Sequence, residues 1–179
     1  GDALLLFVND IIALAKIYSN KSPLKVHPIK FKQFVEKSIS IYEMFAQENN
    51  LKFSCTSDVI IPEHLYIDQF RLRQLIINIL GNALKFTQKG HIHIHFSYKQ
   101  MPDNKFFLEI SIEDTGIGIR ENKLKELKDA FAANRYTEAF GLGFFVVLRL
   151  LQYLNGNINI ESTEFKGTQI GRASCRERV

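Results

Sequence analysis

The chain has 179 residues, of which 46% are apolar, with 15 Phe and no Trp. This length supports one well-packed domain, and the sequence contains neither an apolar run of the roughly 20 residues that span a bilayer nor an opening signal sequence. The net charge of +4 comes without a basic stripe interleaved with aromatic residues, which argues against a nucleic-acid partner.

The first predicted element is a helix at residues 3–18, where apolar residues recur at helical spacing on more than one side. The segment that follows, up to Pro28, contains polar residues and two prolines and is typical of a linker. A second helix is expected at about residues 30–49. Its predicted inward residues are Phe31, Phe34, Val35, Ile41, Tyr42 and Phe45.

Strand signals appear near residues 51–59 and 65–67, and Asp68 is placed to cap the helix that follows. In that helix, one narrow stripe of about 80° beside the apolar side chains is polar. The stripe consists of Arg71, Gln74, Asn78, Asn82 and Lys85. Amide oxygens one turn apart, with a lysine one turn further on, suit a hydrated divalent cation beside a polyphosphate. An interhelical hydrogen-bond network is the alternative.

Two alternating strands are expected at residues 91–96 and 108–114, separated by a turn at residues 102–104. Alternation places Asp114 on the buried face of the second strand, where a carboxylate needs a donor. The exocyclic amine of adenine is such a donor, whereas guanine presents an acceptor oxygen there. Gly116 and Gly118 follow, where a flat base would approach the backbone closely. The alternative is a strand that ends in an Asp-Gly turn.

The first of these strands carries His91, His93 and His95 on one face, a spacing that some zinc sites use. A solvent-facing strand of mixed polarity explains the three histidines as well. We favour that interpretation because no carboxylate or cysteine accompanies them. The two cysteines lack metal or disulfide spacing, which suits a reducing compartment.

A lysine-rich helix at residues 122–129 leads into a polar loop, and a nearly all-apolar helix at residues 141–154 should be central and end at Asn155-Gly156. Gly141 and Gly143 leave backbone N–H groups free at the start of the central helix, where phosphates bind. Plain loop chemistry is the alternative. Strands at residues 158–160 and 167–170 complete the sheet. The arginine-rich residues 171–179 are expected to be an expression-derived tail.

The order and spacing of these motifs resemble the ATP-binding catalytic domain of sensor histidine kinases, within the superfamily of gyrase, heat-shock chaperone and mismatch-repair ATPases. The motifs are Asn78 with Asn82, Lys85 and Phe86, then DTGIGI at residues 114–119, GLG at residues 141–143 and GTQI at residues 167–170. The resemblance runs from about Leu4 to Ile170. It implies an α+β fold, an α/β sandwich whose mixed sheet is covered on one face by helices and preceded by a single helix from a dimerisation hairpin.

The resemblance also implies ATP and Mg²⁺ as cofactors. By position, Asn82 would be the magnesium ligand with Asn78 as a second candidate, Lys85 would contact phosphate, and Asp114 would read adenine. The resemblance further implies a mobile lid over the ATP, in the span from Phe131 to Gly141. Arg135 is the basic residue of this lid that is placed to reach a γ-phosphate, although an isolated surface arginine is the alternative. The implied ATP-binding residues are Asn78, Asn82, Lys85, Phe86, Asp114, Gly116, Gly118, Ile119, Arg135, Gly141, Leu142, Gly143 and Thr168.

These expectations divide the chain into the end of a hairpin helix (residues 1–20), a linker (21–28), a catalytic domain (29–170) and the tail (171–179). No histidine of the chain precedes an acidic residue, as the acceptor of this family does. The resemblance therefore implies transfer to a histidine on a dimerisation hairpin that this chain lacks. It also implies a response-regulator receiver domain as partner and a cytoplasmic homodimer, with or without a membrane anchor in the parent protein.

Two alternatives remain, a slow ATPase of the same superfamily and a degenerate nucleotide-binding module without kinase activity. Hydrolytic relatives place a glutamate general base where this chain has Asn78, and an amide cannot take a proton, so we expect slow hydrolysis.

The lid departs from the family pattern. Lys128 and Ala130 occupy sites that are usually Phe and Pro, Ala139 replaces a glycine, and the span from Phe131 to Gly141 is short.

Overall fold

The computed structural model describes residues 24–102, 105–133, 135 and 141–178. The helices and strands in chain order are β1 (His27–Lys30), α2 (Phe31–Glu48), β2 (Lys52–Ser57), β3 (His64–Ile67), α3 (Gln69–Phe86), β4 (His91–Met101), β5 (Lys105–Asp114), α4 (Glu121–Ala132), α5 (Gly141–Tyr153), β6 (Asn159–Thr163) and β7 (Gly167–Arg178). The predicted helix at residues 3–18 lies outside the described residues.

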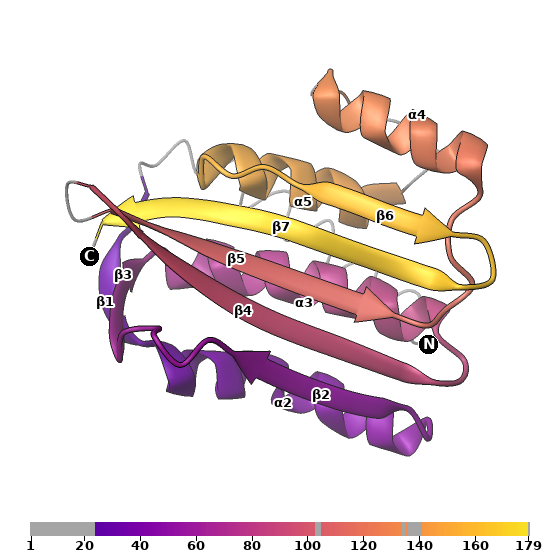
Figure 1. Ribbon diagram of the computed structural model, residues 1–179, viewed down its shortest axis with the longest axis horizontal. Coiled ribbons are helices and arrows are strands. Elements are labelled where there is room, and N and C mark those ends of the chain that lie inside the picture. Colours follow the sequence, from indigo (N-terminus) through magenta and orange to yellow (C-terminus); the bar gives the residue numbers. More distant parts are fainter. Residues whose placement is uncertain (1–23, 103–104, 134, 136–140, 179) are drawn as a thin grey trace.

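Five strands form one sheet in the order β2-β4-β5-β7-β6. β2 runs parallel to β4, and the other neighbours are antiparallel. Helices α2, α3 and α5 lie together on one face of this sheet (Figure 1). The predicted α+β sandwich, with a mixed sheet covered on one face by helices, is therefore confirmed.

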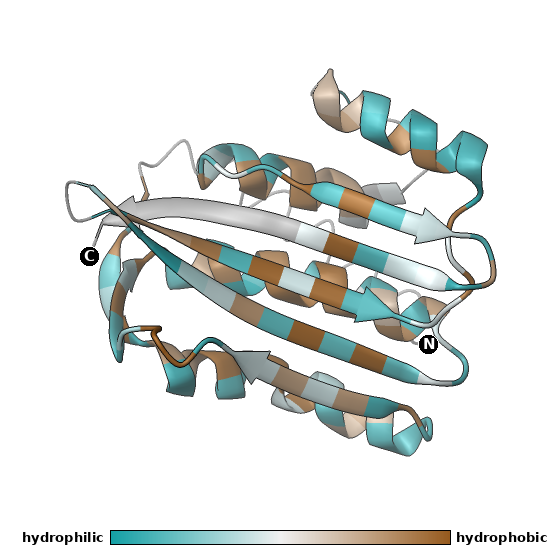
Figure 2. Ribbon diagram, in the orientation of Figure 1, coloured by the Kyte–Doolittle hydropathy of each residue, from teal (hydrophilic) through white to brown (hydrophobic). Residues whose placement is uncertain are grey.

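The core lies between the sheet and the helices, where the apolar face of the sheet packs against the apolar sides of the helices. Along β4 and β5, apolar residues alternate with more polar ones (Figure 2), and Ile92, Ile94 and Leu108 are fully buried. Leu72 and Leu75 of α3 are also fully buried. Burying one such side chain contributes about 1.5–3 kcal/mol, so this apolar face fixes α3 and leaves its polar stripe at the border of the core.

The start of α3 is held by a buried acid–base pair. Asp68 Oδ1 accepts a hydrogen bond from the Arg71 backbone N–H at 3.1 Å, as the predicted N-cap requires, and Asp68 Oδ2 pairs with the Arg71 guanidinium. The Arg71 guanidinium also lies 4.9 Å from the centre of the Tyr153 ring. Arg71, part of the predicted polar stripe, therefore serves the fold.

We expect Asp68→Ala to lower the free energy of unfolding by about 3 kcal/mol, because it removes the helix cap and leaves the Arg71 guanidinium buried without its carboxylate. Urea unfolding measures this change. Glu164→Ala is the matched control, since it breaks the exposed pair with Arg120 at 2.8 Å and should cost less than about 1 kcal/mol. Similar small losses for both variants would contradict the structural role of the buried pair.

Three predictions of local structure were wrong. Two concern where strands begin and end, and the third concerns the buried side of α2. β1 begins at His27, inside the predicted linker, and pairs with β3 in a separate two-stranded ribbon. A short strand that contains a proline is tolerated at a sheet edge, and it gives no alternation signal. β7 continues past Ile170 to Arg178 because β5 supplies its hydrogen-bond partners there, which the apolar pattern does not reveal.

On α2, the predicted inward residues Ile41 and Phe45 are 46% and 44% exposed. The buried side of this helix excludes both residues. The buried residues of α2 are Phe31, Phe34, Val35, Ser38, Ile39 and Ala46. No helix in the described part of the chain combines the length and the apolar character needed to cross a membrane.

Candidate nucleotide site

Two asparagines of α3 lie near Gly143, in the first turn of α5. Asn78 Nδ2 donates to the Gln74 carbonyl oxygen at 2.7 Å. A Cβ atom at Gly143 would lie 3.7 Å from Asn82 Nδ2 and 3.9 Å from Asn78 Oδ1. These distances are ordinary van der Waals contacts, so two motifs that are far apart in the sequence meet at one place.

The Asn82 carboxamide has an unmet hydrogen-bonding atom. Its Nδ2 is buried and has no hydrogen-bond partner in the described part of the chain, a state that costs about 1–3 kcal/mol. A 180° rotation exchanges the carboxamide oxygen and nitrogen, and their placement follows from the surrounding network. A neutral oxygen ligand at this position suits Mg²⁺, so the asparagine pair fits a magnesium-bound phosphate group.

Asp114 ends β5 and is half-buried beside β7. It pairs in register with Thr168, as expected, and its Oδ1 accepts from the Gly116 N–H at 2.8 Å. Burial raises the pKa of the Asp114 carboxyl, while hydrogen bonds from the Gly116 and Thr168 backbones and the nearby Thr87 hydroxyl oppose this rise only in part. The carboxylate is therefore poorly solvated and favours a further donor.

Thr87 is a candidate site residue that the sequence analysis missed. Its hydroxyl faces Asp114 closely enough to lower the pKa of that carboxyl. The buried hydroxyl nevertheless lies outside normal hydrogen-bond geometry with any described residue. The Thr87 hydroxyl can therefore bind a ligand or a water molecule beside Asp114.

The loop after β5 needs its glycines for close backbone approach. A Cβ atom at Gly116 would lie 2.5 Å from the Phe86 carbonyl oxygen and 2.8 Å from Asp114 Oδ1. Gly118 has a φ of +65°, and its Cβ would lie 2.0 Å from the Thr163 carbonyl oxygen. Gly116 thus borders the carboxylate, whereas Gly118 is required by packing against the turn between β6 and β7.

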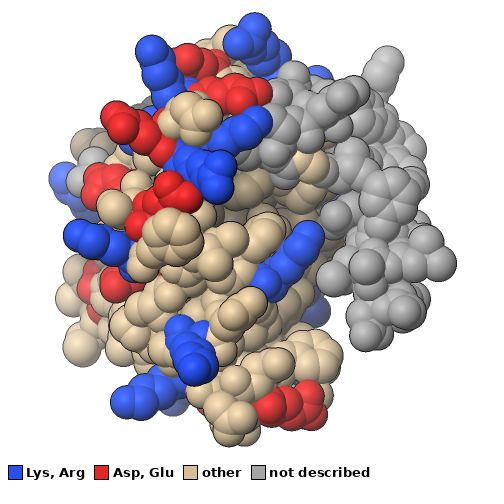
Figure 3. All heavy atoms as spheres, turned by 90° about the vertical axis from the view of Figure 1, so that its right-hand side faces the viewer, with Lys and Arg blue, Asp and Glu red and all other residues tan. Residues whose placement is uncertain are grey.

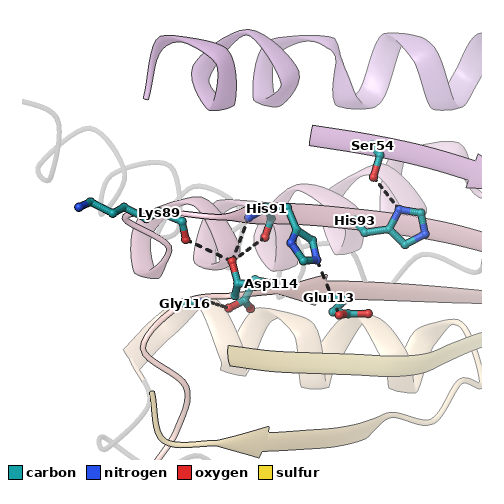
Figure 4. Close-up of polar contacts among 8 residues, drawn as sticks. Ser54, Lys89, His91, His93, Glu113, Asp114 and Gly116 are labelled. Carbon is teal, nitrogen blue, oxygen red and sulfur yellow. Dashed lines mark hydrogen bonds and ion pairs between the residues drawn. The ribbon is translucent and has the colours of Figure 1, made fainter. Parts of the chain in front are cut away.

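Hydroxyl groups fix this loop in place. Thr115 Oγ1 accepts from the His91 N–H at 2.9 Å and donates to the Lys89 carbonyl oxygen (Figure 4). Ser162 Oγ accepts from the Ile119 N–H at 2.8 Å and lies 2.9 Å from Thr168 Oγ1. Sequence reasoning missed Thr115 and Ser162, although Thr115 stands inside the DTGIGI motif.

The comparison with protein families agrees with this geometry. Residues 67–171 match the family described as "Histidine kinase-, DNA gyrase B-, and HSP90-like ATPase". The chain belongs to this ATPase family. The matched range begins just before α3 and includes the asparagine pair, Asp114 and the glycines of α5.

Relatives of this ATPase domain include sensor kinases. The chain is 32% identical over 190 residues to the autoinducer 2 sensor kinase/phosphatase LuxQ of Vibrio vulnificus strain YJ016, which covers 99% of this chain and 22% of that protein. It is 28% identical over 170 residues to the signal transduction histidine-protein kinase BarA of Escherichia coli K12, which covers 92% of this chain and 18% of that protein. The chain thus spans about a fifth of the length of these relatives.

Solved structures share the fold of this ATPase domain. Full-length ShkA in complex with AMPPNP superposes with a TM-score of 0.72 at 23% identity, covering 100% of this chain and 37% of ShkA. The Acinetobacter baumannii histidine kinase AdeS superposes with a TM-score of 0.65 at 22% identity, covering 97% of this chain and 79% of AdeS.

Two further residues of the expected set end α3. Lys85 is exposed in the last turn of α3, with its Nζ 5.2 Å from the centre of the Phe86 ring. Phe86 is 41% exposed, and its carbonyl oxygen accepts from the Ile117 N–H at 3.1 Å. Seen from the side where β5 ends, the middle of the surface carries few charges, and acidic and basic side chains gather towards α4 (Figure 3).

Part of the predicted lid falls outside the described residues, namely the Leu142 side chain and positions 134 and 136–140, which include Ala139. Arg135 is exposed, and its backbone N–H donates to the Ala130 carbonyl oxygen at 3.0 Å. Gly141 begins α5 with a φ of +69° and has no neighbour within 4 Å of an added Cβ.

The three histidines of β4 lie on the sheet face opposite the helices. Ser54 Oγ lies 2.8 Å from His93 Nδ1 (Figure 4), and Thr56 Oγ1 lies 2.8 Å from His95 Nδ1. The expectation that no carboxylate accompanies these histidines was wrong, because pairing in the sheet brings Glu113 to 3.8 Å from His91 and the β2 end brings Asp58 to 3.4 Å from His95. Even so, no group of three or more residues among those described could hold a metal ion.

Proposed function

We propose that this chain is the ATP-binding catalytic domain of a two-component sensor histidine kinase, which transfers the γ-phosphoryl group of Mg-ATP to a histidine supplied by another segment. The observation that carries the proposal is the placement of two chemically different groups at the ends of one site. A carboxamide pair with an unmet buried atom lies beside Gly143 of α5, and a desolvated carboxylate lies at the end of β5. The sensor-kinase relatives named above support the same function.

In this proposal, Asp114 accepts a hydrogen bond from the adenine amine, and the Thr87 hydroxyl and the Gly116 backbone border the base. Thr168 holds Asp114 in place through its backbone N–H. A carboxylate only accepts hydrogen bonds, so it disfavours guanine, which would place an acceptor oxygen opposite it. The base end of the site thereby fixes both the identity and the position of the nucleotide.

At the phosphate end, Asn82 would hold Mg²⁺, with Asn78 beside it and Lys85 near the phosphates. The bound cation supplies neutralisation of phosphate charge, and phosphoryl transfer depends mainly on such neutralisation and on positioning. The N–H groups at the start of α5 would bind the phosphates at the positive end of the helix dipole. Arg135, Gly141 and Leu142 would complete this end as residues of the lid region.

The phosphate acceptor would come from outside the chain. The chain has five histidines, and all of them lie on strands, namely His27 on β1, His64 on β3 and His91, His93 and His95 on β4. None precedes an acidic residue. We infer a dimerisation hairpin in the full-length protein as the acceptor, a homodimer built on that hairpin, and a response-regulator receiver domain as the next member of the phosphorelay.

Slow hydrolysis should distinguish this kinase from a hydrolase of the same family. Asn78 cannot act as a general base, so steady-state ATP turnover by the chain alone should stay well below about one per second. Asn78→Glu should raise turnover at least about tenfold, because it supplies a base one helical turn before Asn82. Asn49→Glu, at the end of α2, is the control. Turnover near one per second for the unmodified chain would contradict the proposal.

Transfer in trans tests the proposed function itself. The chain is incubated with radiolabelled ATP, Mg²⁺ and the separately purified histidine hairpin of its full-length protein. The proposal expects acid-labile, base-stable label on the hairpin. Tight Mg-ATP binding without such label would overturn the kinase assignment and favour a nucleotide-binding module.

A further inference from the structure

A cavity lies between α4, the second half of α5 and the segment that leads into β6. Its volume is about 390 Å³, within the range of small-molecule sites. α4 stands beside β6 at one edge of the sheet (Figure 1). The residues that line this cavity are Lys128, Phe131, Ala132, Leu148, Leu151, Gln152, Gly156, Asn157, Ile158, Asn159 and Ile160, and none of them belongs to the nucleotide site described above.

The cavity has an apolar floor. Leu148, Leu151 and Ile160 are 7%, 3% and 2% exposed, and they form its base. Phe131 and Ile158 form its walls and are only partly buried. An apolar body can therefore remove further surface from water by entering between these walls.

The rim of the cavity is polar and carries positive charge. Among the described residues that line it, Lys128 is the only charged one, and none is a carboxylate. Gln152, Asn157 and Asn159 add amide groups to the lining. A lysine at the edge of an apolar site keeps its ammonium group near water while its stem covers apolar surface. The rim therefore favours an anionic head group over a cationic one.

Lys128 lies on the exposed side of α4, whereas Leu127 and Ala130 are buried. Its ammonium group can therefore remain in water at the mouth of the cavity.

We propose that this cavity binds a small amphipathic carboxylate, with its apolar body between Phe131 and Ile158 and its carboxylate at Lys128. Charge complementarity selects the head group, and the apolar floor selects the body. The inference goes beyond the proposed kinase function and does not depend on it.

Three probes with one aromatic body and different head groups test the proposal on the full chain. Binding of 2-naphthoate, 2-naphthamide and 2-naphthylmethylammonium is followed by NMR titration of the backbone amides of residues 156–160. We expect 2-naphthoate to shift these amides and to bind up to about fivefold more tightly than the amide, since an exposed ion pair contributes up to about 1 kcal/mol. The ammonium probe should bind more weakly still.

Two variants and one control complete the test. Lys128→Glu should weaken 2-naphthoate binding by about tenfold or more, because attraction becomes repulsion. Ala132→Trp should abolish binding by filling the cavity. Lys125→Glu makes the same charge change on α4 outside the cavity lining and should leave binding within about twofold of the parent. Equal binding of the three probes, shifts confined to other residues, or equal effects of the two charge reversals would overturn the proposal.

Discussion

Asn82→Ala should abolish the magnesium dependence of ATP binding and lower phosphoryl transfer by about 10³-fold, a loss of roughly 4 kcal/mol of transition-state stabilisation. The physical reason is the position of the Asn82 carboxamide, which is buried beside Gly143 and lacks a hydrogen-bond partner for its nitrogen in the described part of the chain. Calorimetry with ATP in the presence of Mg²⁺ or EDTA measures the first effect. Transfer to the hairpin measures the second.

The matched control for this variant is Asn49→Ala. Asn49 follows the last residue of α2 as its C-cap. Its Nδ2 also donates to a backbone carbonyl oxygen four residues earlier, that of Phe45, but the contact is exposed. The Asn49→Ala variant should leave both the magnesium dependence of ATP binding and the phosphoryl transfer unchanged. If Asn82→Ala binds Mg-ATP as tightly as the parent and retains its dependence on magnesium, the carboxamide does not hold the cation.

Asp114→Asn should lower ATP affinity by about 10–100-fold, because a hydrogen bond to a charged group contributes about 1.5–3 kcal/mol. Discrimination against GTP should shrink as well, since an amide can turn its N–H₂ group towards the guanine oxygen. Competition of ATP and GTP for a fluorescent nucleotide measures both effects. Glu113→Gln is the control, because Glu113 is the adjacent exposed residue and faces His91.

The raised pKa of Asp114 adds a pH signature. Adenine's amine binds the ionised carboxylate, so ATP affinity should fall as the pH drops through the raised pKa, earlier in an acid titration than an ordinary aspartate would allow. Asp114→Asn should flatten this part of the profile. An unchanged profile in the variant would show that another group titrates.

The raised pKa of Asp114 affects the stability of the unliganded chain in the opposite direction to ATP affinity. A carboxyl whose pKa is raised in the folded state contributes stability below its unfolded pKa, and this contribution is lost as the pH rises through the folded pKa. Near neutral pH, unliganded Asp114→Asn should therefore be at least as stable as the parent in thermal unfolding. This outcome separates loss of nucleotide recognition from loss of folding.

Strong local patterns made much of the fold predictable. The alternation of β5 placed Asp114 on the inner face, and the helical period of α3 placed Asn78 and Asn82 on one stripe beside the core. Asp68 was recognised as a cap because its role depends only on the residues just after it. Each of these features depends on residues within a few positions of one another in the chain, so the sequence pattern is enough to predict it.

Features that depend on pairing between distant segments were missed. β1 and the end of β7 gain their hydrogen bonds from β3 and β5, and no pattern inside either segment indicates the partner. For the same reason, the sequence did not reveal that Asp58 and Glu113 reach the histidine face, or that Thr87 faces Asp114. The family resemblance recovered the order of the site motifs, and the geometry shows which groups of those motifs lie together.

A crystal structure of the chain with Mg-AMPPNP tests the proposed site most directly. We predict the adenine amine within hydrogen-bond distance of Asp114 and the Asn82 carboxamide oxygen bound to the magnesium ion. A nucleotide bound elsewhere, or a site closed by the protein's own side chains with no space for the base beside Asp114, would contradict it.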